Sequence, residues 1–324
     1  MVMAQTLFKI LKAQDPTAII DVMAPSWSSA LLDRMPEVRK SYVMSIAHKK
    51  FALKERYRLA KSIQSEGYTQ AFVLPNSWKS ALIPWWAKIP KRTGYMREFR
   101  YGLLNNYHIL NKQRLPRMID RFAALGLDKG AALSLSLPMP RLEIREESVA
   151  KVKAKFSISL NRPVLALCPG AEFGASKRWP EHHYAAVAKE KILEGWTVWL
   201  LGSKNDMPVS AAIQSELQNQ CVDLTGKTTL EEVIDLLSLT SAVIANDSGL
   251  MHIAAALDKP LVAVYGSTDP GFAPPLGTRA RSVSLRLSCS PCRKRECPLV
   301  HHNCMQKLMP ETVLAALNIA NTVE

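Results

Sequence analysis

The sequence predicts an α/β protein whose two doubly wound domains face each other across a cleft. Three observations support this prediction. The chain has 324 residues, enough for two domains. Short apolar segments alternate with helical patterns in both halves, and the stretch LSLSLPMPRLEI between the halves contains two prolines, as linkers often do. We expect an N-terminal domain over residues 1–140 and a C-terminal domain over residues 141–324.

The C-terminal half shows the clearer alternation. Its predicted strands are short and apolar, which is typical of strands buried on both faces of a parallel sheet. They lie at Val164–Cys168, Thr197–Leu201, Cys221–Leu224, Ala242–Ala245 and Leu261–Tyr265. Helices are predicted between them at His182–Leu193, Val209–Leu217, Leu230–Leu239 and Gly249–Ala256, with a last helix starting near Pro310.

The N-terminal half begins with a helix, which is unusual because a doubly wound domain normally begins on a central strand. Apolar positions at helical spacing predict a helix over Val2–Ala13, and Asp15-Pro16 ends it. The other predicted elements are strands at Ala18–Ala24, Gln70–Leu74 and Arg92–Gly94 and helices at Leu53–Glu66 and Ser77–Lys88.

Positive charge is concentrated in the N-terminal half. The net charge is +14, and residues 1–150 hold 24 Lys and Arg against 12 Asp and Glu, whereas residues 151–324 hold 18 against 16. This excess indicates an anionic partner, either a phosphorylated substrate, a membrane surface or a nucleic acid; a solvated basic surface is the alternative. Neither a membrane-spanning apolar run nor a signal peptide is recognisable, so we expect a cytoplasmic protein.

The segment VIANDSGLMHIAAALDKPLVAVYGSTDP is the sharpest candidate for a binding site. A buried strand turns directly into an apolar helix through Asn246, Asp247, Ser248 and Gly249. Asp247 or Ser248 can cap that helix, and the free amides of its first turn can receive a phosphate. Gly249 lets a ligand approach, and His252 lies one turn further on. A capped helix with a partly buried histidine is the alternative, but the second polar turn, YGSTDP, falls at the same sheet edge and favours a site.

Two further loops follow strands. CPGAEFGASKRWP contains Gly170 and, before the next helix, Lys177. A glycine-bearing loop with a cation suits a diphosphate, although it is not the GxxxxGK[ST] loop of ATPases. In LLGSKNDM, Asn205 or Asp206 can bond a ribose hydroxyl.

Four of the six cysteines lie in CSPCRKRECPLVHHNC, at Cys289, Cys292, Cys297 and Cys304. Their number and spacing suit a structural metal site for zinc or iron. Free thiols and a redox-variable bridge are the alternatives.

These motifs together resemble the heptosyltransferases of glycosyltransferase family 9. The resemblance is carried by PGAEFG…KRWP, LLGS and the 243–270 segment, and in the first half by APSW…LLDRMPEV, VLPNSWKSALIPW and RTGYMREFRYGLLN. It implies the GT-B fold, with two Rossmann-like domains and the donor bound mainly by the C-terminal one. The implied reaction is inverting transfer of heptose from ADP-heptose to the heptosylated inner core of lipopolysaccharide, without an obligatory cofactor.

The resemblance also implies roles for single residues. Lys177 would stabilise the leaving diphosphate, Asp247, Ser248, Gly249 and His252 would hold the donor phosphates and sugar, and Met251 would lie beside the base. The acceptor, Kdo and heptose on lipid A, is strongly anionic, so Lys79, Arg92, Arg97 and Arg100 are candidates for binding it. Trp85 and Trp86 are candidates for contact with the inner-membrane surface, or else are core aromatics.

The family's catalytic carboxylate lies in a Gly-Asp turn after the first strand, a turn this chain does not contain. Met1–Gln5 matches the residues that follow that turn, and neither Asp15 nor Asp21 is placed to replace the carboxylate. The resemblance therefore implies a general base encoded before residue 1, and a chain that binds donor but transfers heptose poorly. The rival interpretations are a sister transferase (I or III) with another core acceptor, an inactive donor-binding form, and a nucleic-acid-binding protein. The last is disfavoured because the C-terminal half is nearly neutral, and we expect no nucleic-acid partner.

Overall fold

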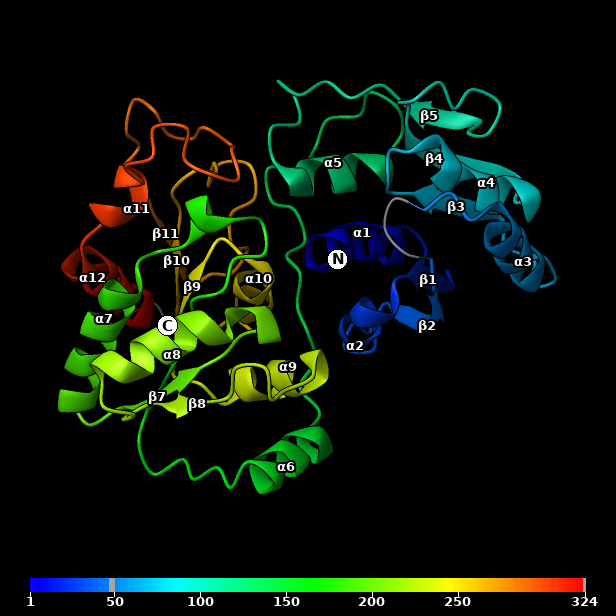
Figure 1. Cartoon of the computed structure of the whole chain (residues 1–324). Helices are drawn as coiled ribbons and strands as arrows, with labels where there is room; N and C mark the ends of the chain where they lie inside the picture. The colour runs from blue at the N-terminus through cyan, green and yellow to red at the C-terminus, as the bar shows by residue number, and fades with distance from the viewer. Residues whose placement is uncertain (47–49, 323–324) are drawn as a thin grey trace. The chain divides into compact units, whose positions relative to one another are not determined.

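The computed structural model describes residues 1–46 and 50–322, and the chain divides into two compact units (Figure 1). Unit 1 comprises Met1 and Met3–Pro138, and unit 2 comprises Val2 and the chain from Met139 onward. The division falls within the proline-containing stretch, two residues before the predicted boundary. Across the described residues, no helix is both long enough and apolar enough to cross a bilayer.

Unit 2 is built on one six-stranded sheet in which every neighbouring pair of strands is parallel. The strand order is β11-β10-β9-β6-β7-β8, so that β6 lies in the middle and successive strands are added first on one side and then on the other. The strands are β6 Val164–Cys168, β7 Thr197–Leu200, β8 Val222–Asp223, β9 Ala242–Asn246, β10 Leu261–Val264 and β11 Ala280–Val283.

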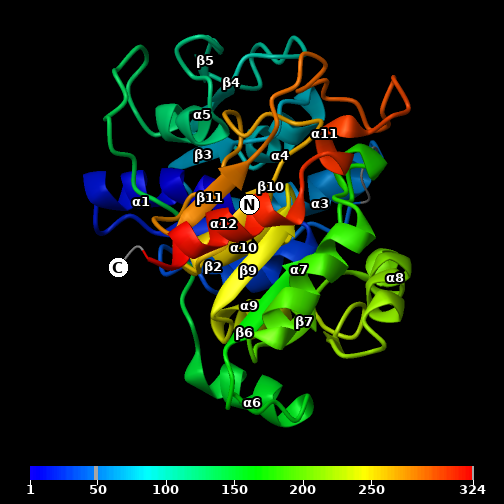
Figure 2. The ribbon, with the colours of Figure 1, turned by 90° about the vertical axis from the view of Figure 1, so that its left-hand side faces the viewer.

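Helices cover both faces of this sheet, because alternate side chains of each strand point to opposite faces and both sets are apolar. One face carries α7 Glu181–Leu193, α8 Met207–Glu216 and α12 Pro310–Asn321 (Figure 2). Against β9 and β10 pack α10 Gly249–Ala256 and, beside it, α9 Leu230–Ser238. The remaining helices of the unit are α6 Glu146–Lys155 and α11 Asn303–Gln306, with short 3-10 turns at Ala175–Lys177 and Lys204–Asp206.

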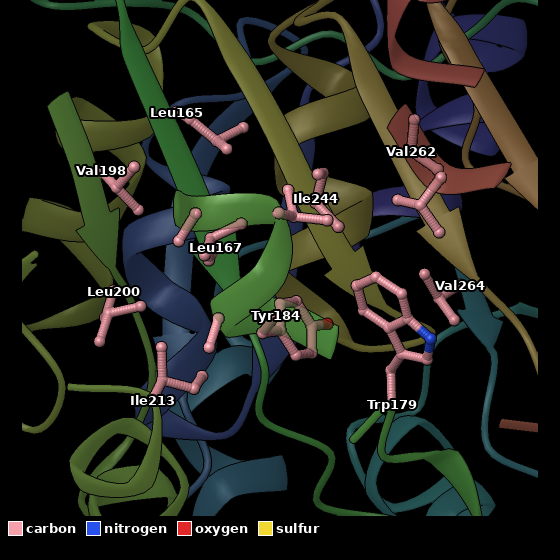
Figure 3. Close-up of a cluster of buried hydrophobic side chains, with 14 of the residues drawn as sticks. Leu165, Leu167, Trp179, Tyr184, Val198, Leu200, Ile213, Ile244, Val262 and Val264 are labelled. Carbon is pink, nitrogen blue, oxygen red and sulfur yellow. The ribbon is translucent and has the colours of Figure 1, made fainter. Parts of the chain in front are cut away.

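The core under α7, α8 and α12 is formed by alternate side chains of the central strands, those that point to this face of the sheet (Figure 3). Leu165 and Leu167 of β6 and Ile244 of β9 are fully buried against Trp179 and Tyr184. Truncating a buried leucine such as Leu167 to alanine typically costs about 2–5 kcal/mol. This core therefore holds the ends of β6 and β9, where the candidate site begins, in a fixed relation.

Unit 1 contains two small parallel sheets. β1 Ile20–Ala24 pairs with β2 Val38–Val43, and β4 Lys91–Tyr95 lies between β3 Gln70–Val73 and β5 Asn106–His108. No strand within residues 1–46 and 50–322 joins the two sheets. The helices are α1 Gln5–Gln14, α2 Ser29–Leu32, α3 Leu53–Gln64, α4 Trp78–Trp86 and α5 Met118–Leu125. Short 3-10 turns at Val2–Ala4 and Ser26–Ser28 precede α1 and α2.

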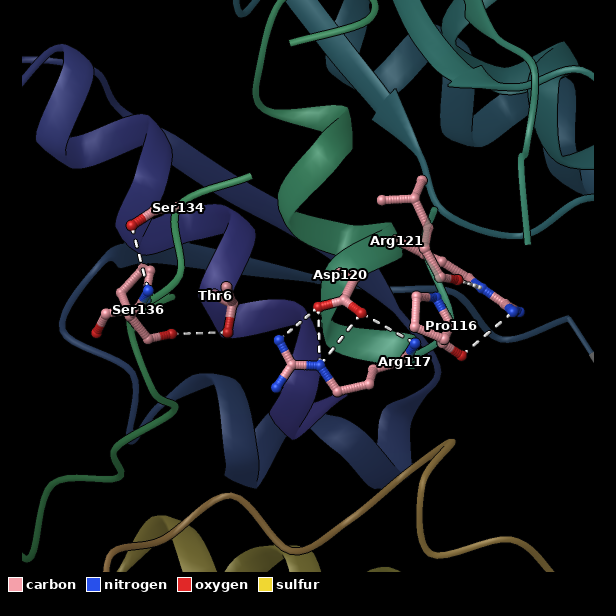
Figure 4. A network of polar contacts seen from close by, with 9 residues as sticks. Thr6, Pro116, Arg117, Asp120, Arg121, Ser134 and Ser136 are labelled. Atoms are coloured by element: carbon pink, nitrogen blue, oxygen red, sulfur yellow. Dashed lines mark hydrogen bonds and ion pairs between the residues drawn. The ribbon is translucent and has the colours of Figure 1, made fainter. Parts of the chain in front are cut away.

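Side-chain hydrogen bonds fix the beginnings of α5 and α1 within unit 1 (Figure 4). At the start of α5 the Asp120 carboxylate accepts hydrogen bonds from the backbone N–H of Arg117 at 3.0 Å and from its Nε at 3.0 Å. This satisfies a helix-terminal amide that has no partner inside the helix. In α1, the Thr6 hydroxyl donates to the Pro138 carbonyl at 2.9 Å, which ties the end of the unit back to its first helix.

The predicted elements were found with ends that differ by at most three residues, and the strands that were not predicted share a cause. The missed strands are β2, β5 and β11, and each lies at the edge of its sheet. Each contains polar or charged residues: Arg39 and Lys40 in β2, Asn106 in β5, and Arg281 in β11. An edge strand is covered on fewer sides and needs no apolar run, so its sequence carries little signal.

Candidate functional site

The candidate site lies in unit 2 at the point where the sheet's strand order reverses. β6 has β7 on one side and β9 on the other, so the connections that leave β6 and β9 diverge to opposite faces. Ligands of open α/β sheets bind in the crevice that this divergence leaves at the carboxyl ends of the strands. Lys177 follows β6 and Asp247 follows β9, which places both predicted residues at this point.

Lys177 and Asp247 form an ion pair there. The Lys177 Nζ lies 2.6 Å from Asp247 Oδ2, and the two side chains are only 14% and 11% exposed. The Thr268 hydroxyl, from the turn after β10, donates to the same Oδ2 at 2.6 Å. The ends of three strands that are neighbours in the sheet, β6, β9 and β10, thus contribute to one polar cluster. The ammonium of Lys177 also lies 4.8 Å from the centre of the Phe173 ring.

The loop that carries Lys177 is anchored on both sides of it by buried groups. Trp179 is fully buried, and its indole N–H donates to the Leu308 carbonyl at 2.7 Å. Its backbone N–H donates to Asn246 Oδ1 at 3.1 Å, while the Asn246 side-chain amide donates to the Pro169 carbonyl at 2.7 Å. Asn246 therefore joins the end of β9 to both ends of the loop, which keeps the ammonium of Lys177 in place without a ligand.

The first turn of α10 offers unsatisfied donors. Ser248 is the N-cap residue, but its side chain makes no capping hydrogen bond, and its buried Oγ has no partner among the residues described. The expectation that Asp247 or Ser248 caps the helix is therefore wrong, because Lys177 and Thr268 already engage the Asp247 carboxylate. A side chain added at Gly249 would meet no atom within 4 Å. An open helix N-terminus with an orphaned hydroxyl suits an anionic ligand.

Of the two residues of α10 that were predicted to contact a ligand, His252 is available to do so and Met251 is not. Burial lowers the pKa of His252 to about 4, although the Asp247 charge acts in the opposite direction, so its imidazole is neutral at pH 7 and can donate or accept a hydrogen bond. Met251 is fully buried, and its sulfur accepts a hydrogen bond from Tyr265 Oη at 3.3 Å. The expected contact of Met251 with a base is not available in this structure, because no surface of the side chain is exposed.

In the loop after β7, Asp206 has an internal role. Its carboxylate is buried and accepts from the backbone N–H and the hydroxyl of Ser203, at 2.9 and 2.7 Å. Gly170 packs on this carboxylate so closely that a Cβ would lie 2.5 Å from Asp206 Oδ2. The contact with Asp206 is by itself enough to require glycine at this position. Asn205 is exposed and remains the candidate of this loop for a ribose hydroxyl.

Two of the four predicted acceptor residues have structural roles in unit 1. The Arg100 guanidinium is fully buried and donates to the carbonyls of Pro75 at 2.7 Å and Tyr95 at 3.1 Å. Arg92 donates in the same way to the carbonyls of Leu103 and Ile89, both at 2.7 Å. Their prediction as acceptor-binding residues is wrong in this conformation, because the donors that would bind a carboxylate or phosphate are already used.

Lys79 and Arg97 remain accessible. Arg97 is exposed, and Lys79, which is half-buried, makes one long hydrogen bond of 3.3 Å from its ammonium to the Lys50 carbonyl. Both can turn toward an anionic ligand without breaking a close contact.

The two carboxylates near the start of the chain are engaged locally. Asp15 accepts from the backbone N–H and the hydroxyl of Thr17, at 2.9 and 2.6 Å. Asp21 is held by Arg39 and by the Tyr68 hydroxyl. Burial alone would raise the pKa of Asp21, but these two hydrogen bonds hold it below its ordinary value. A carboxylate stabilised in its charged form is a poor proton acceptor, in agreement with the expectation that neither residue acts as general base.

The cysteine loop, residues 289–304, packs against the Lys177 loop. The four cysteines are free thiols, and burial together with the charges of Cys289, Cys292 and Cys297 raises the pKa of Cys304. Yet no group of three His, Cys, Asp or Glu in the part of the chain that the structure describes is arranged to hold a metal ion. A metal at this loop stays a prediction from the cysteine spacing.

Sequence reasoning missed Thr268 and Phe173. Thr268 lies in the YGSTDP turn, whose position after a strand was noted, but only the fold shows that its hydroxyl reaches Asp247. Phe173 lies in an irregular loop and has no periodic signal.

A doubly wound sheet with a cation, a free helix N-terminus and polar turns at its switch point, together with a second α/β unit, is the architecture expected of GT-B glycosyltransferases. The profile of glycosyltransferase family 9 (heptosyltransferase) matches residues 56–302. The chain belongs to this family and is a glycosyltransferase.

Relatives with high identity extend over almost the whole chain. Lipopolysaccharide heptosyltransferase 2 of Salmonella typhimurium is 46% identical, over 98% of this chain and 94% of the relative. Lipooligosaccharide heptosyltransferase 2 of Haemophilus influenzae is 43% identical over 98% and 95%. The solved structure of ADP-heptose LPS heptosyltransferase II from E. coli superposes with a TM-score of 0.88, at 42% identity, and the match covers 99% of this chain and 95% of that one.

Proposed function

We propose that this protein transfers heptose from ADP-heptose to the heptosylated inner core of lipopolysaccharide. The observation that carries the proposal is the Lys177–Asp247–Thr268 cluster beside the open N-terminus of α10. Its cation and free amides match a nucleotide diphosphate. The heptosyltransferase 2 relatives support heptose as the sugar and the lipopolysaccharide core as the acceptor.

In this reaction the acceptor hydroxyl attacks the anomeric carbon of heptose and gives its proton to a general base, and ADP leaves with its bonding electrons. Negative charge grows on the diphosphate as the bond breaks. Lys177 and the amides of the first turn of α10 stabilise that charge, and the unpartnered Ser248 hydroxyl donates a hydrogen bond to it. The anchoring of the Lys177 loop by Trp179 and Asn246 means that these groups need little rearrangement when the donor binds. Lys79 and Arg97 are our candidates for binding the anionic acceptor.

A direct assay of heptose transfer tests the function. Purified protein, ADP-heptose and heptosylated Kdo-lipid A should give a product heavier by one heptose, detected by mass spectrometry. We expect this transfer to be slow, because neither Asp15 nor Asp21 is placed to act as general base. Kdo-lipid A without heptose is the control that separates this acceptor from that of a sister transferase. Transfer to the control acceptor alone would contradict the proposed acceptor, and absence of transfer to either would contradict the proposed activity.

We propose that transfer requires no cofactor, and that any metal at the cysteine loop is structural. Treatment with a chelator should then leave heptose transfer unchanged while elemental analysis of the protein reports its zinc or iron. Loss of transfer on chelation, restored by one metal, would contradict this proposal.

We further propose that the protein works in the cytoplasm, bound peripherally to the inner-membrane surface, where its lipid-anchored acceptor lies. Support comes from an aromatic-basic face on α3 and α4, defined by Phe51, Leu53, Tyr57, Trp78 and Trp85, which are 39–46% exposed. The Phe51 and Trp78 rings lie 5.1 Å apart, and Tyr57 and Trp85 both contact Trp86, so the exposed rings form two groups that each join α3 or the residues just before it to α4.

Cations flank that face along α3. Lys54, Arg58 and Lys61 follow one another at helical spacing and are exposed, so they lie on the same side of the helix. Aromatic rings favour the headgroup region of a bilayer, and each nearby Lys or Arg adds about 1 kcal/mol of attraction to an anionic surface. The combination suits a membrane that carries negative lipids.

Sedimentation with vesicles tests this contact. The protein should sediment with phosphatidylglycerol vesicles, and the Trp85→Ala and Lys54→Glu variants should bind them more weakly. Trp27→Ala is the matched control, because Trp27 is 64% exposed but lies outside the face. Equal losses for Trp27→Ala and Trp85→Ala would contradict the assignment of this face.

A further inference from the structure

The cysteine loop contributes its backbone directly to the loop that carries Lys177. The backbone N–H of Ser176 donates to the Arg295 carbonyl at 3.1 Å, and the Ser176 hydroxyl donates to the Lys294 carbonyl at 2.6 Å. The same hydroxyl shares a hydrogen bond with the Ser267 hydroxyl at 2.9 Å, and the Arg293 N–H donates to the Ser267 carbonyl at 2.7 Å. The Arg293–Arg295 segment is thus held between the turns after β6 and β10.

Gly174 shows how close this approach is. Its φ is +152°, and a Cβ there would lie 2.4 Å from the Arg295 carbonyl oxygen. Any other residue would push the two loops apart. The position of Arg295 relative to the Lys177 loop is therefore set by its backbone contacts with Ser176 and Gly174.

The side chains of Lys177 and Arg295 share one aromatic ring. The Lys177 Nζ lies 4.8 Å and the Arg295 Cζ 5.5 Å from the centre of Phe173. Cations at these distances are attracted by the ring. Phe173 therefore keeps a second cation close to the cluster formed by Lys177 and Asp247.

Two of the neighbouring cations already have carboxylate partners. Lys177 pairs with Asp247, and Arg293 lies 3.3 Å from Asp269. Arg295 is exposed, and in the part of the chain that the structure describes it has no carboxylate partner. A diphosphate carries at least two negative charges, more than a Lys177 that is already neutralised can balance alone.

We propose that Arg295 supplies a second positive charge to the diphosphate of the nucleotide sugar, beside Lys177. The inference rests on the proposed function, since it takes this site to be the donor site. A guanidinium can donate two parallel hydrogen bonds to phosphate oxygens. The cysteine loop thereby acquires a role in donor binding, since its backbone contacts with Ser176 and Gly174 hold Arg295 in place.

Calorimetric titration of the full chain with ADP and with adenosine tests the proposal. The Arg295→Gln variant should bind ADP about 10-fold more weakly, the loss expected for one charge-assisted contact, and adenosine with unchanged affinity. Arg295→Lys should recover part of the ADP affinity as a point charge. Arg286→Gln is the matched control, because it removes one exposed cation of unit 2 outside residues 289–304.

The outcomes separate this inference from the function on which it rests. ADP affinity lost in Lys177→Met but retained in Arg295→Gln would overturn the role of Arg295 and leave the donor site intact. Equal weakening of ADP and adenosine binding in Arg295→Gln would show a structural role and would also overturn it. If the unaltered chain binds no ADP, both the inference and the proposed donor site fall.

Discussion

Replacing Lys177 with methionine should affect both donor binding and the stability of unit 2. The Lys177 Nζ lies 2.6 Å from the Asp247 carboxylate, and the two side chains are 14% and 11% exposed. Surface ion pairs contribute about 0.2–1 kcal/mol to stability, whereas removing one partner of a fully buried pair costs about 3–5 kcal/mol. The burial of this pair lies between these two cases. We expect Lys177→Met to lower the free energy of unfolding by about 2 kcal/mol, because Asp247 keeps only the Thr268 hydroxyl as a partner.

The double variant reports the coupling between the two residues. Asp247→Asn in the Lys177→Met background removes the uncompensated charge, so the two changes together should destabilise the protein by about 1–3 kcal/mol less than the sum of the single changes. For binding, loss of a charge-assisted contact of about 1.5–3 kcal/mol should weaken ADP affinity about 10- to 150-fold in Lys177→Met.

Urea denaturation of the four proteins, followed by circular dichroism, measures the coupling, and calorimetry with ADP measures the affinity. Strictly additive stability changes would show that the ion pair contributes nothing. ADP affinity that does not change in Lys177→Met would refute the assignment of the donor site, whatever the stability result.

Three further predictions concern residues with structural roles. Arg100→Met should destabilise unit 1 by about 3 kcal/mol, because the carbonyls of Pro75 and Tyr95 lose their buried donor; a thermal midpoint equal to that of the unaltered protein would contradict this. Gly170→Ala should lower stability by about 1–3 kcal/mol, since its Cβ would meet the Asp206 carboxylate, and Gly249→Ala, where a Cβ meets no atom, is the control in the same denaturation assay. The pKa of Asp21 is held below its ordinary value of 3.8, so its contribution is complete above that pH and is lost as the pH falls through the lowered pKa; Asp21→Asn should therefore make acid denaturation less steep there, and an identical acid transition would contradict the role of Arg39 and Tyr68.

The central strands of unit 2 could be predicted from the sequence alone. The central strands of unit 2, such as Val164–Cys168, are buried on both faces and therefore consist of uninterrupted apolar residues. Their order along the chain, alternating with helices, is enough to bring the turns after β6, β9 and β10 to one edge of the sheet. For this reason Lys177 and Asp247 could be predicted as members of one site.

The sequence did not reveal how polar side chains would be used. Arg97 and Arg100 are three residues apart in one motif, yet Arg97 is exposed and Arg100 is buried among backbone carbonyls. Asp206 was a candidate for ribose, but it caps its own turn through Ser203. Composition and spacing show that a hydrogen-bonding side chain is present. Only the fold decides whether that side chain binds a ligand or another part of the same chain.

By itself, the sequence determined the α/β class, the location of the parallel sheet in the second half and the turns that carry Lys177, Asp247 and Ser248, because these follow from the periodicity of apolar residues and from turn chemistry. The tertiary structure alone decided that Thr268 completes the cluster at Asp247, that Met251 is enclosed, and that Phe173 brings Arg295 beside Lys177. The physical reason is that such contacts join residues up to about 120 positions apart. Their geometry depends on how loops pack, and loop packing produces no periodic pattern in the sequence.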